Sequence, residues 1–420
     1  MTPFLSCHKN TYQILHEMNF TQRSINNSQI FVFVVCGGAE HIETLHFSLQ
    51  ALRRVSAHPV IVLTDSSRNE IPVAHDTVVD IKTPKEFDHH QASIYLKTGI
   101  HKFLPKGNLY CYLDTDVVAL DGEVDDIFKQ KTPVITFATD HCKVQKFSPH
   151  AVNCNCLKEN QRLRQELAAI LLKYNAQLDI KDPALLEKQR RLIKKFDILK
   201  KDKLSYFFIT LRFLFTLHKF KLDDDTYFLR WKKIWVDKKG DTILLTKPRS
   251  LVSLIEKETA WKWDSTAEKW ISPDGHDLDN LICNHLTKYI FDKFSIKVED
   301  QNWQHWNGGV FLFDDDSHAF LESWHTKTLA IFKDSKWKTR DQGTLIATAC
   351  EFGLQSAQTL PIEFNFLADY NHPTLQYLKG FTFSFNNRSG RIRPHFLHIY
   401  HQWGNREWDL WRDVETYVLS

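Results

Sequence analysis

The residues of this sequence best suited to hold a metal ion are two aspartates, Asp114 and Asp116, at the end of a predicted strand. The strand, residues 109–113, is apolar and aromatic without alternation, which is typical of a strand covered on both faces. Two carboxylates at i and i+2, where a strand turns into a loop, can point at one divalent cation. Because oxygen ligands suit magnesium and manganese, which commonly bridge to phosphates, the pair indicates such a site. The alternative is a polar turn at the strand end.

Three other groups of polar residues accompany apolar elements downstream. Two glycines before a strand let a backbone approach a ligand closely, or form a tight turn. An aspartate at a helix start can bind a substrate or only cap the helix, and histidines in a short strand can be metal ligands or structural residues. The groups are Asn307, Gly308 and Gly309 before the strand 310–313, Asp341 and Gln342 at the start of a predicted helix, and His398 and His401 in the segment 394–404.

The elements that must position these residues alternate between strand and helix. Continuous apolar runs predict strands, and apolar residues at spacings of three and four predict amphipathic helices. The alternation predicts an α/β fold with a parallel or mixed sheet, in which ligands bind at the carboxyl ends of the strands. The expected strands are 30–36, 60–63, 77–81 and 109–113, and the expected helices are 41–54 and 89–104.

The composition divides the chain into unlike parts. Of 420 residues, 43% are apolar and 25% charged, and the 14 Gly and 13 Pro are too few for a collagen-like or disordered chain. The net charge of +3 is the sum of two unlike parts. Residues 157–240 carry 21 basic and 11 acidic residues, while the remainder of the chain carries 33 basic and 40 acidic residues. We therefore predict a large, mainly helical, basic and Trp-rich insertion at 157–300 between two halves of one sheet domain, 1–156 and 301–420.

Taken in order, four motifs resemble those of the GT-A fold glycosyltransferases, and glycosyltransferase family 8 (the glycogenin and galactosyltransferase type) in particular. The motifs are Leu113-Asp114-Thr115-Asp116-Val117, Asn307-Gly308-Gly309-Val310, Arg340-Asp341-Gln342-Gly343-Thr344-Leu345 and His401-x-x-Gly404. The resemblance covers roughly residues 30–140 and 303–408. It implies a GT-A, Rossmann-like mixed sheet flanked by helices. It also implies a metal-dependent hexosyltransferase that uses Mn²⁺ (or Mg²⁺) and a nucleotide-diphosphate sugar, most often a UDP-sugar, and retains the anomeric configuration.

The resemblance also implies a role for each matching residue. Asp114 and Asp116 would bind the metal, with His401 as the third ligand. Asp341 and Gln342 would be the catalytic residues, in contact with the sugar near the reacting carbon. The donor would be bound by Val35, Cys36 and Gly37 at the base, by Lys97 at the diphosphate, by Asn307, Gly308 and Gly309 beside the sugar, and by Arg406 near the leaving phosphate.

Two positions depart from the family pattern, and two other functions compete. The family's Lys-Pro-Trp is here Arg406-Glu407-Trp408, so Arg406 would replace the lysine, and His398 competes with His401 as the metal ligand. A nucleotidyltransferase would share the strand-end carboxylates, but it would typically carry a Gly-rich basic loop, and residues 37–40 contain no Lys or Arg. A non-catalytic carbohydrate-binding protein is the other alternative, and the intact Asp and Gln residues count against it.

A basic segment and an apolar segment follow each other inside the insertion. Residues 186–203 carry eight Lys or Arg, and residues 204–217 are mainly apolar, with Arg212 as their only charged residue. They are typical either of a solvated helix followed by a buried one, or of a peripheral membrane element through 186–217. The second interpretation suits a lipid-linked rather than a free glycan acceptor, and no motif for nucleic acid is visible. Its interfacial residues would be Tyr206, Phe207, Phe208, Phe213 and Phe215.

The cysteines and the first residues indicate the cellular compartment in which the protein is expected. Eight cysteines without a regular framework suit a reducing compartment, and residues 1–5 do not begin a secretory signal. We expect a cytoplasmic protein, peripheral on the inner face of the membrane if 186–217 binds lipid. His141, Cys142, Cys154 and Cys156 are suitable zinc ligands, but their spacing matches no common finger, and buried free thiols are the alternative.

Overall fold

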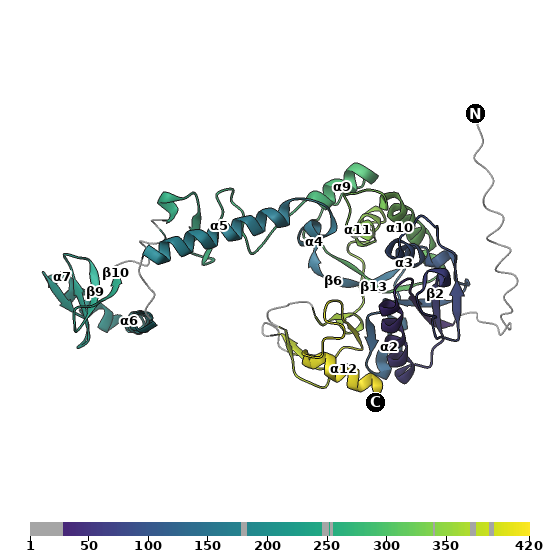
Figure 1. The fold of residues 1–420 in the computed structure, drawn as a ribbon, viewed down its shortest axis with the longest axis horizontal. Helices are drawn as coiled ribbons and strands as arrows, with labels where there is room; N and C mark the ends of the chain where they lie inside the picture. Colours follow the sequence, from purple (N-terminus) through teal and green to yellow (C-terminus); the bar gives the residue numbers. More distant parts are fainter. Residues whose placement is uncertain are drawn as a thin grey trace. The chain divides into compact units, whose positions relative to one another are not determined.

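The computed structural model describes residues 28–177, 183–245, 252, 255–338, 341–369, 375–385 and 390–420 (Figure 1). The chain forms two compact units: unit 1 comprises Met1–Cys154 and Cys283–Ser420, and unit 2 comprises Asn155–Ile282. Where we predict an insertion ending at 300, the chain returns to unit 1 at Cys283. The reason is that helix α9 (His285–Phe294) buries Leu286 and Ile290 in a core of unit 1.

Unit 1 is built on a six-stranded sheet, which confirms the predicted α/β fold with a mixed sheet. The strands are β1 (Gln29–Val34), β2 (Val60–Thr64), β3 (Val78–Asp80), β4 (Leu109–Leu113), β6 (Thr136–Lys143) and β13 (Gln304–Phe313). Their order is β3-β2-β1-β4-β13-β6. The first four are parallel, and β13 is antiparallel to both β4 and β6. The strand order reverses between β1 and β4, which is where ligands bind in sheets of this kind.

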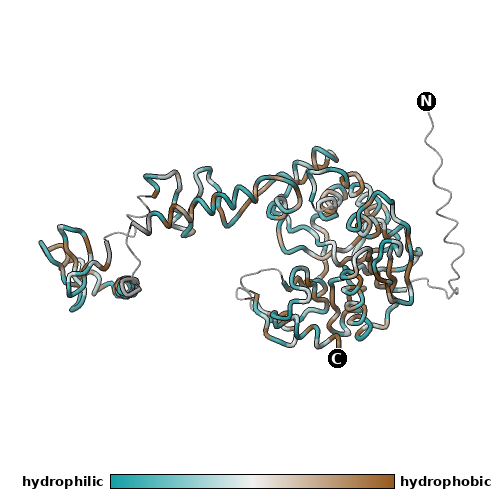
Figure 2. The backbone as a smooth tube through the Cα atoms, viewed as in Figure 1, coloured by the Kyte–Doolittle hydropathy of each residue, from teal (hydrophilic) through white to brown (hydrophobic). Residues whose placement is uncertain are grey.

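Helices cover both faces of this sheet. On one face, α3, α10 and α11 pack with Val32 and Phe311; on the other, α2 packs its apolar stripe against Phe31 and Phe33. Because neighbouring β1 residues enter different cores, that strand is apolar from Ile30 to Val34. Figure 2 colours the chain by hydropathy, and hydrophobic stretches run through the strands and helices of unit 1. These helices are α2 (Ala39–Val55), α3 (His89–Thr98), α10 (His318–Ile331) and α11 (Gln342–Glu351).

Smaller elements complete unit 1. A three-stranded sheet joins β14 (Phe366–Leu367), β18 (Phe396–His398) and β5 (Val117–Ala119), with β18 antiparallel to β5. It matters for function because β5 follows Asp114 and Asp116 directly, and β18 ends at His398. The other elements are β15 (Leu375–Tyr377), β16 (Phe383–Phe385), β17 (Arg391–Ile392), α4 (Val144–Ala151), α12 (Asp409–Leu419) and the 3₁₀ helices η1 (Ser66–Arg68), η2 (Ile100–Lys102), η3 (Gly122–Gln130), η4 (Asp315–Ser317) and η5 (Ile362–Phe364).

Unit 2 combines helices with small antiparallel sheets, which the sequence pattern did not predict. Its helices are α5 (Cys156–Gln177), α6 (Pro183–Lys201) and α7 (Lys203–Phe215). Its strands are β7 (Lys219–Lys221), β8 (Thr226–Leu229), β9 (Ile234–Asp237) and β10 (Thr242–Leu245) in one sheet, and β11 (Lys262–Asp264) and β12 (Lys269–Ile271) in another. Among the described residues of either unit, no helix is both long enough and apolar enough to cross a membrane.

Candidate active site

A cavity of about 930 Å³ lies within unit 1 at the carboxyl ends of β1, β4 and β6. This volume is at the upper end of the usual range for small-molecule sites. Its walls bring together segments far apart in the sequence, all on unit 1. The lining residues predicted from the sequence are Val35, Cys36, Lys97, Asp114, Asp116, Asn307, Gly308, Gly309, Asp341, Gln342, His398 and His401.

The two predicted metal-binding aspartates are held by the pairing of β4 with β13. The backbone N–H of Asp114 donates to the carbonyl of Gly309 at 2.8 Å, so the turn after β4 lies directly against the Asn-Gly-Gly segment. The Tyr112 hydroxyl donates to Asp114 Oδ1 at 2.5 Å and fixes that carboxylate. The sequence places Asn307–Gly309 before a strand, either as a close approach to a ligand or as a tight turn. They lie inside β13, at an irregularity in its pairing with β6.

Of the two histidines that the sequence leaves open as the third ligand, His398 lies beside these carboxylates. One ligand atom from each of Asp114, Asp116 and His398 lies within 4.8 Å of the others, and His398 Nε2 is 3.3 Å from Asp116 Oδ1. The cause is register, because β18 places His398 opposite Val117, the residue after Asp116. His401 lies three residues beyond the end of β18 and lines the cavity with an exposed side chain, outside this cluster.

The cluster has the donors of a divalent metal site. His398 Nδ1 is 2.9 Å from Asn365 Oδ1, which orients the ring so that Nε2 faces Asp116. Burial disfavours the charged form of both side chains, but each stabilises the charge of the other. The pKa of Asp116 is therefore lowered and that of His398 raised. Two carboxylates and one imidazole fit manganese or magnesium, with room in the cavity for phosphate oxygens.

Lys97 lies between two carboxylates of the cavity. Its Nζ is 3.1 Å from Asp114 Oδ1 and 3.2 Å from Asp341 Oδ2, and only 9% of the residue is exposed. Burial alone would lower the pKa of Lys97 and raise that of Asp341. The ion pair outweighs burial, so the lysine pKa is raised and the aspartate pKa lowered. Asp341 precedes α11, but its side chain makes no capping hydrogen bond, so the alternative of a simple cap does not describe it.

Gln342 and Asn307 are held by hydrogen bonds across the cavity wall. Gln342 Oε1 accepts from the Gly308 N–H at 3.2 Å, and its Nε2 donates to the Trp306 carbonyl. Asn307 Nδ2 donates to Asp140 Oδ2 at 3.0 Å. Both side chains are thus fixed relative to β13, while still lining the cavity.

Asp140 is a cavity residue that the sequence reasoning missed. It is 6% exposed and is hydrogen-bonded by the His141 backbone N–H at 2.8 Å. Burial opposes its ionisation, but the hydrogen bond from the His141 side chain and nearby histidine charge hold its pKa below the ordinary value. A weaker sequence signal was available, because Asp140 comes two residues after the short, mostly apolar run 135–138, although it lies inside β6 and not after the strand.

Two predicted donor-binding residues do not line the cavity. Gly37, with φ +109°, forms the turn after β1, where its N–H donates to Asn69 Oδ1 at 3.1 Å. Its neighbours Cys36 and Gly38 form the wall instead. Arg406 is exposed and pairs with Glu415 of α12 at 2.7 Å, because the turn after β18 directs it toward that helix. Arg340, which is part of the third motif shared with the glycosyltransferases, lies outside the described residues.

The chain was compared with known proteins. No protein-family model and no curated protein matches it. Similar solved structures include apo glycosyltransferase GlyE from Streptococcus pneumoniae TIGR4, which is 19% identical, with a TM-score of 0.20 over 27% of this chain and 29% of that one. Galactosyltransferase LgtC, in complex with donor and acceptor sugar analogs, is 12% identical. Its TM-score is 0.20, and the match covers 26% of this chain and 46% of LgtC.

The bifunctional glycosyltransferase WbbM, in its apo form, is matched over more of this chain. It is 10% identical, with a TM-score of 0.39 over 94% of this chain and 50% of that one. The chain thus spans half or less of the length of each of these three solved proteins. Parts of this chain are therefore similar in structure to proteins whose names describe them as glycosyltransferases.

Proposed function

We propose that this protein is a metal-dependent glycosyltransferase of GT-A type that transfers a sugar from a nucleotide-diphosphate sugar, in the first instance a UDP-sugar. The observation that carries the proposal is the convergence of Asp114, Asp116 and His398 at the wall of one cavity with Lys97 and Asp341. In this cavity, the cluster of Asp114, Asp116 and His398 could bind a metal, Lys97 supplies a positive charge, and Asp341 supplies a negative one. The acceptor would be a glycan or a lipid-linked glycan, as in polysaccharide biosynthesis.

The residues divide the chemistry between them. A bound Mn²⁺ or Mg²⁺ would neutralise charge on the diphosphate as it leaves. Lys97 adds a positive charge that its two carboxylate partners hold in place. An inverting enzyme needs a carboxylate base to take the proton of the acceptor. Because the ion pair with Lys97 lowers the pKa of Asp341, that group is a weak base, which favours transfer with retention.

The proposal is tested by donor hydrolysis in the presence of manganese. A panel of UDP- and other nucleotide-sugars is incubated with the full chain and MnCl₂, and release of the nucleoside diphosphate is measured against a metal-chelated sample. We expect metal-dependent release of the diphosphate from one or two donors. Release of pyrophosphate from a nucleoside triphosphate and a sugar phosphate would indicate a nucleotidyltransferase. Sugar binding without turnover of any donor would indicate a carbohydrate-binding protein.

The stereochemistry of transfer gives a separate prediction. We expect the anomeric configuration of the product to equal that of the donor sugar, since Asp341 is engaged by Lys97 and poorly suited to act as a base. The coupling constant of the anomeric proton, followed by NMR from the start of the reaction with the identified donor, measures this. A product of opposite configuration would contradict retention and assign Asp341 the role of base.

The exposed face of α7 supports a membrane-borne acceptor. None of the residues of α7 is buried, and only Ile209 and Phe213 pack on the core of the β7–β10 sheet. Phe213, which the sequence pattern assigns to the interface, contacts Phe220 and Phe228, with ring centroids 5.1 and 5.4 Å apart. The exposed apolar residues are Leu204, Tyr206, Phe207, Phe208, Leu211, Leu214, Phe215 and Leu217.

The charges of the same unit suit an anionic surface. Lys201 and Lys203, on either side of the start of α7, and Lys219 of β7 are all exposed. Aromatic residues on one helix face with basic residues around it are the features of a helix that lies in a membrane interface. We propose that α7 binds the acceptor's membrane and places the protein on its cytoplasmic, anionic side.

Flotation with vesicles measures this contact. We expect the protein to float with vesicles rich in phosphatidylglycerol, and the double variant Phe207→Ser, Phe208→Ser to bind at least about fivefold less, because two large side chains no longer enter the interface. Leu172→Ser, a change of another exposed apolar residue of unit 2 at 72% exposure, is the matched control and should bind as wild type does. A wild-type protein that stays in the soluble fraction with these vesicles would refute the contact.

A further inference from the structure

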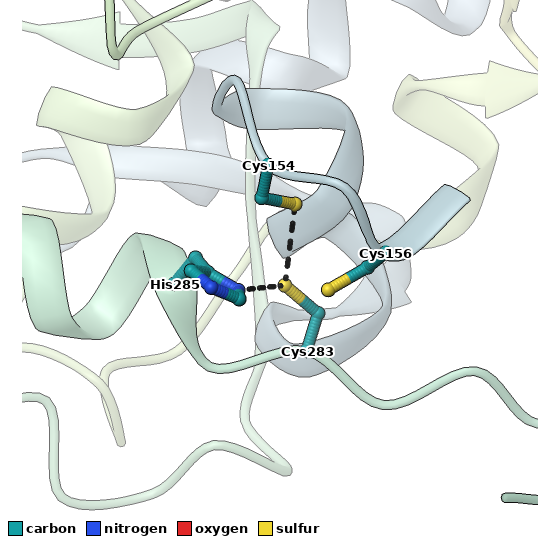
Figure 3. Close-up of side chains that lie close together, drawn as sticks. All are labelled: Cys154, Cys156, Cys283 and His285. Carbon is teal, nitrogen blue, oxygen red and sulfur yellow. Dashed lines mark hydrogen bonds between the residues drawn. The ribbon is translucent and has the colours of Figure 1, made fainter. Parts of the chain in front are cut away.

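The side chains of three cysteines and one histidine lie close together, although they come from two distant segments of the chain (Figure 3). None of the four lines the cavity. Cys154 and Cys156 precede and begin α5, and Cys283 and His285 precede and begin α9. One ligand atom from each lies within 4.8 Å of all the others. Cys142, which the sequence groups with Cys154 and Cys156, lies instead beside Asp140 and His305 near the cavity.

The distances between the ligand atoms fit a tetrahedral zinc ion. Cys154 Sγ is 3.8 Å from Cys283 Sγ, and Cys283 Sγ is 3.2 Å from His285 Nδ1. Around a tetrahedral zinc, Zn–S bonds of about 2.3 Å place two sulfurs about 3.8 Å apart, and a sulfur and a nitrogen about 3.5 Å apart. A disulfide requires about 2.05 Å between sulfurs, so the two cysteines are not bonded to each other.

A buried hydroxyl is oriented toward one of the sulfurs. The hydroxyl of Ser148, on α4, accepts a hydrogen bond from the Leu286 N–H at 3.0 Å and donates to Cys283 Sγ at 3.1 Å. Ser148 is fully buried, and Cys283 is 3% exposed. A donor fixed in this way stabilises a thiolate, the form in which cysteine binds metal. The Cys283 N–H donates to the Gln145 carbonyl at 3.2 Å, which also fixes the backbone of this ligand.

We propose that Cys154, Cys156, Cys283 and His285 bind one structural zinc ion. Three thiolates and one imidazole complete four-coordination, so no position is left for a substrate, and this is the pattern of structural rather than catalytic zinc sites. The chain leaves unit 1 after Cys154 and returns to it at Cys283. The metal therefore joins the two ends of a long inserted segment, whose closure would otherwise cost conformational entropy. The site is independent of the proposed sugar transfer.

Metal analysis of the full chain tests the site. Protein purified without added metal, and without a metal-affinity tag, should contain about one zinc per chain by plasma mass spectrometry. Cys283→Ser should contain less than about a fifth of that amount. Cys350→Ser, a change of a half-buried cysteine outside the cluster, is the matched control and should keep its zinc. Zinc below a fifth of an equivalent in wild type, or full zinc in Cys283→Ser, would overturn the proposal.

Cobalt replacement makes the test independent of whether the variants fold. Wild type prepared with Co²⁺ should show a thiolate-to-cobalt charge-transfer band and the strong d–d bands of a tetrahedral site. The cluster of Asp114, Asp116 and His398 has no sulfur and cannot give the thiolate band. Because Cys142 lies in a second cluster with Asp140 and His305, the band should also be present in Cys142→Ser. Its absence, or a Cys154–Cys283 disulfide in non-reducing peptide mass spectrometry, would refute the zinc site. Neither result would affect the donor hydrolysis assay, so failure of this site and of the proposed function are distinguishable.

Discussion

Replacing Asp116 by asparagine should lower manganese-dependent turnover of the donor by about 10³-fold, which corresponds to about 4 kcal/mol of transition-state stabilisation. The change keeps the shape of the side chain but removes the negative charge from the cluster. It also removes the partner that stabilises the charged form of His398, 3.3 Å away. Turnover and manganese affinity, by initial rates and by titration calorimetry, should fall together. Asp126→Asn, a change of an exposed carboxylate of η3, should have no effect on either.

The same measurements distinguish the two histidines. His398→Ala should weaken manganese binding by at least about tenfold, because its imidazole belongs to the ligand cluster. His401→Ala should change manganese affinity by less than about twofold, since His401 lies outside that cluster. An Asp116→Asn enzyme that turns over within threefold of wild type would place the metal elsewhere. A larger loss of affinity in His401→Ala than in His398→Ala would restore the family's His-x-x-Gly histidine as the ligand.

Replacing Gly309 by alanine should abolish manganese binding without any change of a ligand. A Cβ atom at this position would lie 2.5 Å from His398 Cε1, 2.9 Å from Asn307 Oδ1 and 3.1 Å from Asp114 Oδ2. The His398 ring cannot easily move aside, because it is buried and its Nδ1 is hydrogen-bonded to Asn365. We expect manganese affinity to fall by at least about 100-fold, and the free energy of unfolding to fall by about 1–3 kcal/mol.

Gly308→Ala is the matched control for this change. Its added Cβ would lie 3.4 Å from Gln342 Oε1 and 3.5 Å from Lys97 Nζ, which are ordinary van der Waals distances, so neither side chain has to move. We expect Gly308→Ala to bind manganese within about threefold of wild type in calorimetry, whatever its effect on turnover. Equal manganese affinity in Gly309→Ala and wild type would mean that the metal does not use His398 and Asp114 together.

The central sheet and its carboxylates were predictable because the information is local. β1 and β4 are each covered on both faces, so β1 is apolar from Ile30 to Val34 and β4 is apolar or aromatic throughout. Asp114 follows β4 directly. From the sequence, the Asn-Gly-Gly segment precedes a strand and is either a tight turn or a close approach to a ligand. Its actual place inside β13 depends on pairing with β4 and β6, which lie more than 160 residues earlier.

The differences between prediction and structure, at the site and in unit 2, have the same origin. Which of His398 and His401 lies beside the carboxylates depends on where β18 ends and on its register with β5. The motif assigns Arg406 to the donor, whereas in the structure its side chain pairs with Glu415 and does not line the cavity. Two of the three partners of Cys154, Cys283 and His285, lie 129 and 131 residues further along the chain, and no spacing rule links them to it. The small sheets of unit 2 consist of strands of three or four residues, too short for a clear period of two.

The bounds of unit 2 have a consequence for how this protein can diverge. The segment begins after Cys154 and ends before Cys283, whose sulfurs are only 3.8 Å apart. Its length and content can therefore change during evolution without altering the register of β4, β13 and β6, which holds the carboxylates. If the proposed function is correct, we expect related enzymes to share the donor site and to differ in the segment between Cys156 and Cys283. Exchanging residues 157–282, which keeps Cys154, Cys156, Cys283 and His285, should then change the acceptor and leave the donor unchanged.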